Sequence, residues 1–293
     1  MTLTSEPIAP QPPLLKQRLL RLLKGFAFCY LLICLVFSIL QTKLIFPGAA
    51  TQGQRASQHR AGAREELLEL KTPAGERVVA LFAAAKHADP KSRPTIIFFY
   101  GNGMCLANCI RDFCDFRDRG FNIIMADYLG YGMSGGQAGE QGVYASADAC
   151  WDYLLQSGRV DARKIVPVGW SLGGAAAIDL ASRKPAAAVV TLSAFTSMNA
   201  MARLITPILP TGLMLKHHFR NDEKLKQIHV PVLIIHGDQD SIIPPAMASA
   251  LEKAANPPVT RVMIEGADHN NLFEVGGDAL IDRITTFIND NVK

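Results

Sequence analysis

The sequence lacks the cysteine patterns of a metal site. Its six cysteines, at positions 29, 34, 105, 109, 114 and 150, include no Cys-x-x-Cys pair and no Cys/His cluster at zinc spacing, so neither a metal nor another cofactor is expected. Cys105 and Cys109 lie four apart on a predicted helix, where a disulfide seldom forms, and the later cysteines have apolar neighbours. We expect buried, unpaired thiols, which leave the redox compartment open.

A strong excess of charge is also missing. The net charge is +4 on 30 basic and 26 acidic residues, which are scattered and form no basic stretch interleaved with aromatic residues. This pattern excludes a nucleic-acid partner. The chain does have length and apolar residues. Because 293 residues that are 49% hydrophobic can bury one sizeable core, we expect one folded domain after an N-terminal segment.

The N-terminal segment carries one long uncharged run, from Gly25 to Thr42. At about 1.5 Å per residue in a helix, this run is just long enough to cross the apolar core of a bilayer. A signal peptidase could cut after Gly48-Ala49-Ala50, but Lys43 and the apolar Leu44 to Pro47 separate that place from the run. A retained membrane anchor is therefore favoured over a cleaved signal peptide.

The charges beside the run predict its orientation. Four basic residues precede it and only Lys43 follows it closely, which favours a single-pass membrane protein with its N-terminus inside and its folded domain exoplasmic or periplasmic. Arg55, Arg60 and Arg64, farther along, reduce this asymmetry. The four preceding residues are Lys16, Arg18, Arg21 and Lys24. The predicted segments are a disordered and basic N-terminus (1–24), a transmembrane anchor (25–42), a linker (43–65) and one domain (66–293).

From position 66 onward, short apolar runs alternate with helical patterns. This alternation predicts an α/β fold, with a mostly parallel sheet, helices on both faces and catalytic groups at the carboxyl ends of the strands. The predicted strands are Glu66–Leu70, Val78–Ala84, Thr95–Tyr100, Phe121–Asp127, Ile165–Val168, Ala188–Ser193, Val232–His236 and Thr260–Ile264. The predicted helices are Met104–Arg119, Glu140–Gln156, Ser171–Arg183, Pro245–Ala254 and Leu280–Asn291.

One interval, Thr196 to Gln227, is longer than a simple crossover between strands needs. It carries many apolar residues, among them Met198, Leu204, Ile208 and Leu213. One interpretation is a small helical lid over the site. The other is ordinary core packing by one or two extra helices, and the sequence leaves both open.

The stretch from Ile165 to Ser182 predicts a strand, a sharp turn and a helix, with Ser171 at the turn in a Gly-x-Ser-x-Gly pattern. In a nucleophile elbow the serine sits in a strained turn that exposes its hydroxyl, and the flanking glycines let neighbouring backbone approach. A serine nucleophile needs a general base, for which histidine has a suitable pKa. His269, in a glycine-bearing loop after the last strand, is the predicted base, whereas His236 lies inside a strand end and is expected to be structural.

The base in turn requires a carboxylate on its other ring nitrogen. Asp240 lies beyond the end of a predicted strand and is the expected acid, while Asp238 is expected to bond loop backbone. Two backbone N–H groups must also hold the oxyanion that forms on the substrate. Leu172 would supply one from the start of its helix, and Asn102 the other from the loop after an earlier strand, with Gly103 as the alternative.

These motifs together resemble the α/β-hydrolase superfamily. They are Gly-Trp-Ser-Leu-Gly-Gly at 169–174, His-Gly-Asp-Gln-Asp-Ser-Ile-Ile-Pro at 236–244, Gly-Ala-Asp-His-Asn at 266–270 and the glycine-rich 126–136. More narrowly, the apolar run ending in Lys43 to Pro47, the Gly101-Asn102 loop and the short insertion after Ser197 resemble the Bem46-like group. The resemblance covers roughly residues 40–290. It implies an α/β-hydrolase fold with an eight-stranded sheet and a short helical lid, and the triad order Ser171, Asp240, His269.

The chain departs from this group at two positions. Tyr100 stands where the group usually has the histidine of His-Gly-Asn, so the hydrogen bonds that support this loop are expected to differ. Leu129 stands where a polar residue is common in Asp-Tyr-x-Gly. Neither departure touches the nucleophile, acid or base.

The predicted function is a serine hydrolase that cleaves carboxylic ester or thioester bonds through an acyl-enzyme. Some members of the resembled group resemble protein depalmitoylases, and an anchored domain with an apolar lid suits a small-molecule or lipid acyl substrate drawn from the bilayer. One alternative is a serine peptidase of the same fold, although nothing indicates an amine-recognition site. Another is a non-catalytic, membrane-tethered binding module. An epoxide hydrolase of this fold would carry aspartate in place of Ser171.

Overall fold

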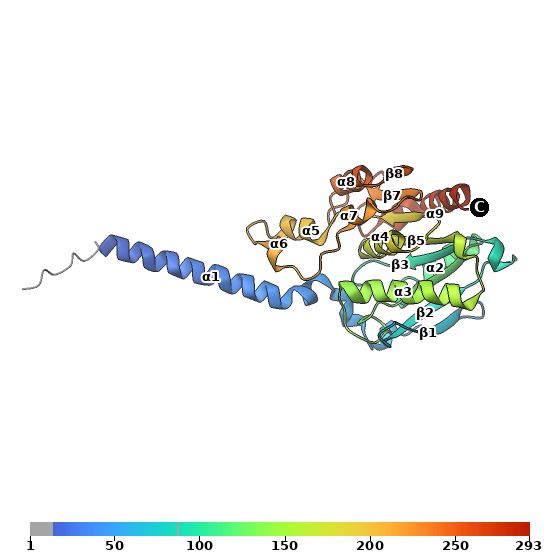
Figure 1. Ribbon diagram of the computed structural model, residues 1–293, viewed down its shortest axis with the longest axis horizontal. Coiled ribbons are helices and arrows are strands. Elements are labelled where there is room, and N and C mark those ends of the chain that lie inside the picture. The colour runs from blue at the N-terminus through green and yellow to red at the C-terminus, as the bar shows by residue number, and fades with distance from the viewer. Residues whose placement is uncertain (1–13, 87) are drawn as a thin grey trace, which may run out of the picture. The chain divides into compact units, whose positions relative to one another are not determined.

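The computed structural model of the protein describes residues 14–86 and 88–293 (Figure 1). The chain forms two compact units, Met1–Gln41 and Thr42–Lys293. Helix α1 (Leu14–Ile45) includes residues 14–24, which the sequence grouped with a disordered N-terminus. The leucine-rich pattern of these residues continues into the apolar run, so one helix extends through both. The predicted disorder at 1–13 lies outside the described residues.

Eight strands of the second unit form one sheet in the order β1-β2-β4-β3-β5-β6-β7-β8. The pairs β1·β2 and β2·β4 are antiparallel, and all pairs from β4 to β8 are parallel, which confirms the predicted mostly parallel sheet. The strands are β1 (Glu66–Lys71), β2 (Arg77–Ala83), β3 (Thr95–Phe99), β4 (Asn122–Ala126), β5 (Ile165–Trp170), β6 (Val189–Leu192), β7 (Val232–Gly237) and β8 (Val259–Ile264).

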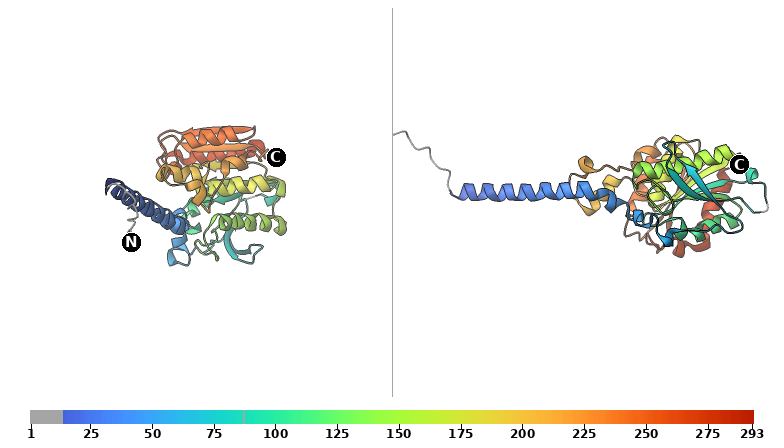
Figure 2. Two further views of the ribbon diagram at one scale, coloured as in Figure 1. Left: turned by 60° about the vertical axis from the view of Figure 1, so that its left-hand side comes forward. Right: turned by 90° about the horizontal axis from the view of Figure 1, so that it is seen from below.

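Helices cover both faces of this sheet (Figure 2). Helices α2 and α9 contact each other, while α3, α4, α7 and α8 contact one another in that order. The remaining α-helices are α2 (Ile110–Asp118), α3 (Glu140–Ser157), α4 (Leu172–Arg183), α5 (Met198–Ile205), α6 (Thr211–Met214), α7 (Asn221–Leu225), α8 (Ala246–Ala254) and α9 (Leu272–Asn291). Short 3-10 helices lie at η1 (Pro47–Thr51), η2 (Arg55–Ser57), η3 (Pro90–Ser92), η4 (Leu106–Asn108) and η5 (Ala162–Lys164).

Burial along the strands follows their place in the sheet. Every residue of β3, β4 and β7 is buried, as expected for parallel strands covered on both faces. Strand β8 was predicted to be buried in the same way, and this was wrong, because Thr260 and Arg261 are exposed. As the last strand of the sheet, β8 has a neighbour on one side only.

Two helices differ from their predicted bounds. In place of one helix from Met104, the chain forms η4 and then α2, so Cys105 and Cys109 do not share a helix. The side chain of Asn108 accepts a hydrogen bond from the N–H of Cys105, a local bond that competes with a continuous helix. Helix α9 begins before the predicted start and has a kink at Gly277, where φ is 50°. The adjacent glycines lower helix propensity and concealed this part from the pattern.

All six cysteines lie within the described residues and are unpaired; the prediction of buried, unpaired thiols concerned the four from Cys105 onward. Cys105, Cys109 and Cys150 are buried, whereas Cys114 is partly exposed. Burial raises the pKa of Cys150 to about 12. This thiol therefore behaves as a small apolar side chain.

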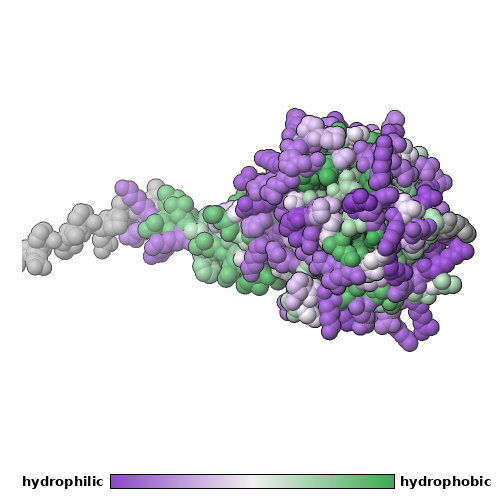
Figure 3. Space-filling view, turned by 45° about the vertical axis from the view of Figure 1, so that its right-hand side comes forward, coloured by the Kyte–Doolittle hydropathy of each residue, from purple (hydrophilic) through white to green (hydrophobic). Residues whose placement is uncertain are grey.

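Helix α1 is long and apolar enough to cross a membrane. The stretch Lys16–Ile45 contains an 18-residue window with a mean hydropathy of 2.3, and none of this window is buried. In Figure 3, hydrophilic atoms lie near the start of the helix and hydrophobic atoms follow. A buried core helix would also be apolar, but it would not be exposed in this way.

The segment after this helix packs onto the sheet-containing unit instead of forming a free spacer. Phe46 is buried, the N–H of Gly53 donates to the carbonyl of Gly132 at 2.9 Å, and the Gln52 amide donates to the carbonyl of Ser134 at 3.0 Å. The polar composition of 49–63 had predicted a linker between membrane and domain. Some of these polar groups instead form hydrogen bonds with the loop after β4.

The two halves of the insertion, residues 196–227, differ in how deeply they are buried. In its second half, Phe219 and Leu225 are fully buried, and α7 contacts α4 and α8, which is ordinary core packing. In its first half, α5 contains no fully buried residue, and α6 buries only Thr211. A lid role is thus left to α5 and α6 alone.

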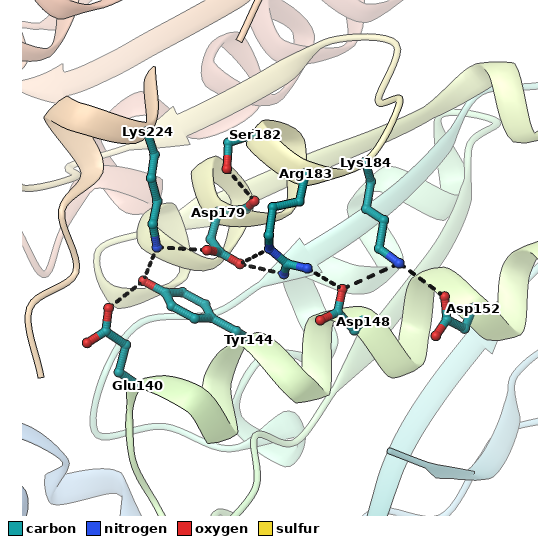
Figure 4. Close-up of polar contacts among 9 residues, drawn as sticks. All are labelled: Glu140, Tyr144, Asp148, Asp152, Asp179, Ser182, Arg183, Lys184 and Lys224. Carbon is teal, nitrogen blue, oxygen red and sulfur yellow. Dashed lines mark hydrogen bonds and ion pairs between the residues drawn. The ribbon is translucent and has the colours of Figure 1, made fainter. Parts of the chain in front are cut away.

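Polar contacts hold α7 against α3 and α4 (Figure 4). Nζ of Lys224 lies 2.7 Å from Oδ1 of Asp179 and 2.7 Å from the hydroxyl oxygen of Tyr144, and this hydroxyl donates to Glu140 at 3.0 Å. The Asp179 side chain is nearly inaccessible, and Arg183 contacts its other oxygen at 2.5 Å. Because Ser171 directly precedes α4, this cluster links the insertion to the helix that follows the predicted elbow.

Candidate active site

Ser171 occupies the sharp turn between β5 and α4. Its φ of 55° and ψ of −116° are a strained backbone conformation for a residue with a side chain. A Cβ on Gly169 would lie 2.0 Å from the carbonyl oxygen of Gly173, and a Cβ on Gly173 would lie 2.0 Å from that of Phe99. The N–H of Ser171 donates to the carbonyl of Leu192 at 2.8 Å. The two glycines therefore permit close backbone contacts that fix the turn.

The three predicted triad residues meet at the carboxyl ends of the strands. Oγ of Ser171 lies 2.9 Å from Nε2 of His269, and Nδ1 of His269 lies 2.8 Å from Oδ2 of Asp240. Asp240 belongs to the loop after β7, and His269 belongs to the loop between β8 and α9. All three residues are buried. This geometry places a base beside the hydroxyl and a carboxylate beside the base.

The carboxylate of Asp240 accepts hydrogen bonds on both oxygens. Oδ1 accepts the N–H groups of Ile242 and Ile243 at 3.1 and 2.7 Å, and Oδ2 lies 3.2 Å from Nε2 of His236. Burial alone would raise the pKa of Asp240, but bonds from His236, His269 and the Ile243 N–H hold this pKa below its ordinary value. The side chain is therefore ionised at neutral pH.

Two other aspartates join the loops that carry the acid and the base. Oδ1 of Asp238 accepts the N–H of Gly266 at 2.8 Å, as expected for a carboxylate that bonds loop backbone. Oδ1 of Asp268 accepts the N–H and hydroxyl of Ser241 at 2.7 and 2.9 Å, and the N–H of His269 at 2.7 Å. These bonds fix one loop against the other.

The predicted oxyanion donors have available N–H groups. Within residues 14–86 and 88–293, neither the N–H of Leu172 nor that of Asn102 donates to another group of the chain. The N–H of Gly103, the alternative, donates to the Asn102 side chain at 3.1 Å. That side chain also accepts from the Tyr131 hydroxyl at 2.8 Å and donates to the carbonyl of Ile45. The Asn102 side chain thus supports the loop, and its backbone is left for a ligand.

Tyr100, at the start of this loop, forms hydrogen bonds through its hydroxyl group. The hydroxyl donates to Asp127 at 3.0 Å and accepts the N–H of Tyr128 at 3.2 Å. Asp127, a residue that the sequence analysis missed, also accepts the N–H groups of Leu106 and Met133 at 2.6 and 2.7 Å. Its position as the last residue of a predicted strand was the available signal. Leu129, the second departure, has a buried side chain.

Two further neighbours of the triad were not predicted. The Trp170 ring lies tilted over that of His269 with centroids 6.0 Å apart, and it meets Phe273 edge to face at 5.6 Å. His236, expected to be structural, also contacts Asp240, because the loop after β7 turns back on the strand. Among the described residues, no group of three or more His, Cys, Asp and Glu could hold a metal ion.

The chain is similar in sequence to proteins of the alpha/beta hydrolase fold. A family model described as the alpha/beta hydrolase fold matches residues 94–213. Alpha/beta hydrolase domain-containing protein 17B of Xenopus tropicalis is 31% identical over 224 residues, which cover 76% of this chain and 75% of that protein. An uncharacterized protein of Mycobacterium tuberculosis (strain H37Rv) is 35% identical over 171 residues, or 58% of this chain, and the match spans only 61% of that relative's length.

Solved structures share the fold at lower identity. An esterase of Pyrococcus furiosus superposes with a TM-score of 0.66 at 17% identity, covering 80% of this chain and 97% of the esterase. DcsB, solved with its substrate analogue, superposes with a TM-score of 0.63 at 19% identity, covering 78% of this chain and 99% of DcsB. These similarities, with the eight-stranded sheet and its helices, show that the chain belongs to the alpha/beta hydrolase superfamily.

Proposed function

We propose that this protein is a serine hydrolase that cleaves carboxylic ester or thioester bonds. The observation that carries the proposal is the line of contacts from Oγ of Ser171 through both ring nitrogens of His269 to the carboxylate of Asp240. Superfamily membership supports hydrolysis in general, and the strained turn at Ser171 supports a nucleophile at that position.

In the proposed reaction, Oγ of Ser171 attacks the acyl carbon while its proton passes to Nε2 of His269. Asp240 stabilises the imidazolium through Nδ1–H. The carbonyl oxygen becomes an oxyanion that accepts hydrogen bonds from the N–H groups of Leu172 and Asn102. His269 then gives the proton to the departing alcohol or thiol. Water, deprotonated by His269, attacks the acyl-enzyme, and collapse of this second intermediate releases the acid and restores the serine.

We propose that α1 is a retained membrane anchor, with the N-terminus inside and the catalytic unit exoplasmic or periplasmic. The length and hydropathy of the helix support the anchor. The basic residues before the apolar run support the orientation. Protease protection in intact cells or spheroplasts tests it: the catalytic unit should be digested from outside, and protection of that unit until the membrane is opened would overturn the orientation.

The proposed substrates are acyl esters or thioesters of a small molecule or a lipid. The test is a panel of p-nitrophenyl esters of increasing acyl length, the matching thioesters and an anilide, each given to the full-length protein in detergent. We expect turnover of esters and thioesters that is lost in Ser171→Ala and retained in Ser134→Ala. Cleavage of the anilide alone would replace the esterase proposal with a peptidase.

A further inference from the structure

We propose that the outer side of α5 and α6 is a lipid-binding surface that rests in the apolar part of a bilayer. We call this surface the apolar face, and it consists of Leu204 and Ile205 of α5, Ile208 in the turn between the two helices and Leu213 of α6, with exposed fractions of 55%, 77%, 78% and 91%. The inference rests on the proposed membrane anchor and deepens the proposed hydrolase activity, because it names the place from which substrate arrives.

The composition of α5 is unusual for a helix in contact with water. Met198 and Met201 pack against the core, while Leu204 and Ile205 are exposed at the other end of the helix. The helix reads Met-Asn-Ala-Met-Ala-Arg-Leu-Ile, so only two of its residues are polar. A surface helix of a soluble protein normally presents polar residues outward. Neighbouring exposed apolar residues instead mark a surface that binds a protein or a membrane.

Contacts between the insertion and the C-terminal end of α1 indicate which partner covers this face. Oγ1 of Thr42 lies 2.9 Å from Nε2 of His217, and the Phe46 ring packs edge to face on His217 at 4.9 Å. Phe46 is buried and also packs on Phe219, with ring centroids 6.0 Å apart. Because Thr42 ends the apolar run, the insertion is fastened where the chain leaves the proposed anchor.

The distances along the chain are short enough for this arrangement. Leu213 lies four residues before His217, a span of at most about 14 Å for a fully extended chain. The interfacial layer of a bilayer and the adjacent acyl region are within that reach. Amphipathic helices that lie in this layer bury their apolar side chains by several ångströms, with a strength that scales with the apolar area buried.

The base of the insertion is held in place, so the apolar face is presented without rearrangement. Glu140 accepts the N–H groups of His218 and Phe219 at 2.6 and 2.9 Å. Lys224 joins Asp179 and the Tyr144 hydroxyl on the neighbouring helices (Figure 4). These bonds fix the chain directly after α6 and leave α5 and α6 with their outward residues exposed.

A second copy of this chain is the other occupant that such a face could take. The bilayer is favoured because the contacts of His217 with Thr42 and Phe46 hold the insertion beside the end of the apolar run. The substrate class that follows is an acyl ester or thioester whose long chain resides in the membrane.

The first test maps lipid contacts on the full-length protein in phosphatidylcholine vesicles that contain a phosphatidylcholine with a diazirine on its acyl chain. After illumination and digestion, we expect lipid adducts both within residues 25–42 and within residues 204–213. Adducts confined to 25–42 would leave the anchor in place and overturn the lipid-binding surface. Adducts in neither segment would overturn the anchor and this inference together, and a protein–protein cross-link through 204–213 without lipid adducts would identify a second copy as the occupant.

The second test measures hydrolysis in the same vesicles. The variant Ile205→Ser/Ile208→Ser/Leu213→Ser should lower the ratio of the rate on a vesicle-resident palmitoyl ester to the rate on a soluble butyryl ester by about tenfold or more. Leu155→Ser, which changes an exposed leucine on α3, is the matched control and should leave this ratio unchanged. An unchanged ratio in the triple variant would overturn the inference. If wild type hydrolysed neither ester, the result would count against the hydrolase proposal instead.

Discussion

Oδ2 of Asp240 lies 2.8 Å from Nδ1 of His269, on the side of the imidazole opposite Ser171. A carboxylate in this position holds the ring in one tautomer and stabilises it when it charges. We therefore expect Asp240→Asn to lower kcat by about 10⁴-fold in ester hydrolysis, with the protein still folded. Steady-state kinetics on the preferred ester of the panel provides the measurement.

Asp238→Asn is the matched control, because Asp238 precedes Asp240 by two positions and its carboxylate accepts the N–H of Gly266. It should cost far less in kcat than the change at Asp240. If Asp238→Asn were the more damaging of the two, the assignment of the acid would be wrong.

His236 provides a second prediction, because its Nε2 lies 3.2 Å from Oδ2 of Asp240 and 2.8 Å from the carbonyl oxygen of Ile243. That carbonyl can only accept, so Nε2 carries the hydrogen. His236→Phe removes this donor and should lower kcat by about tenfold or more, the loss of one hydrogen bond to a charged group. His236→Gln, which keeps an N–H donor at a similar reach, should retain more of the rate. Equal loss in both variants would point to packing alone.

The strands and the order of the triad could be predicted because they depend on local signals. Apolar runs of strand length and the Gly-x-Ser-x-Gly turn are contained in short stretches, and parallel topology then brings Asp240 and His269 to the same edge as Ser171. The double role of His236 could not be predicted, because the loop after β7 must first turn back on its own strand. The start of α9 was missed for a local reason, the glycines at its kink, whereas its end at Asn291 was predicted.

The contacts between segments far apart in sequence were beyond prediction. Thr42 meets His217, and Asn102 meets Ile45, across long stretches of chain that carry no pattern linking them. Tyr100 is a similar case. The sequence shows that a tyrosine replaces the usual histidine, but it does not show that the tyrosine hydroxyl bonds the carboxylate of Asp127.

The pKa of Asp240 predicts how stability changes with pH. The folded-state pKa is held below the ordinary value of about 3.9. A carboxylate of this kind contributes stability that is fully present above its unfolded-state pKa and is lost as pH falls toward the folded-state pKa. The free energy of unfolding should therefore decrease as the pH drops from about 4 toward 3. The Asp240→Asn variant should lose less of its free energy of unfolding over that interval. Tm of both proteins in the same detergent, followed from about pH 6 to pH 3, measures the difference.

The close packing around Gly173 leads to a prediction for Gly173→Ala, which adds one methyl group. A Cβ at this position would lie 2.0 Å from the carbonyl oxygen of Phe99, so Gly173→Ala must shift the backbone of the elbow. Gly135→Ala is the control, because its Cβ would meet its nearest neighbour at 3.5 Å, an ordinary contact. We expect the first variant to lose hydrolysis and to unfold at a lower temperature, and the second to resemble wild type. Full activity in Gly173→Ala would show that the elbow is not as tight as these contacts indicate.

The most direct measurement of the central claim is covalent labelling of Ser171 by a fluorophosphonate. The reagent forms a stable adduct only with a serine that is activated by a base, as the 2.9 Å contact with Nε2 of His269 indicates. Intact mass and peptide mapping of the full-length protein should show one adduct on Ser171, and Ser171→Ala should show none. Absence of an adduct in wild type, under conditions that label other serine hydrolases, or an adduct on another serine, would contradict the account.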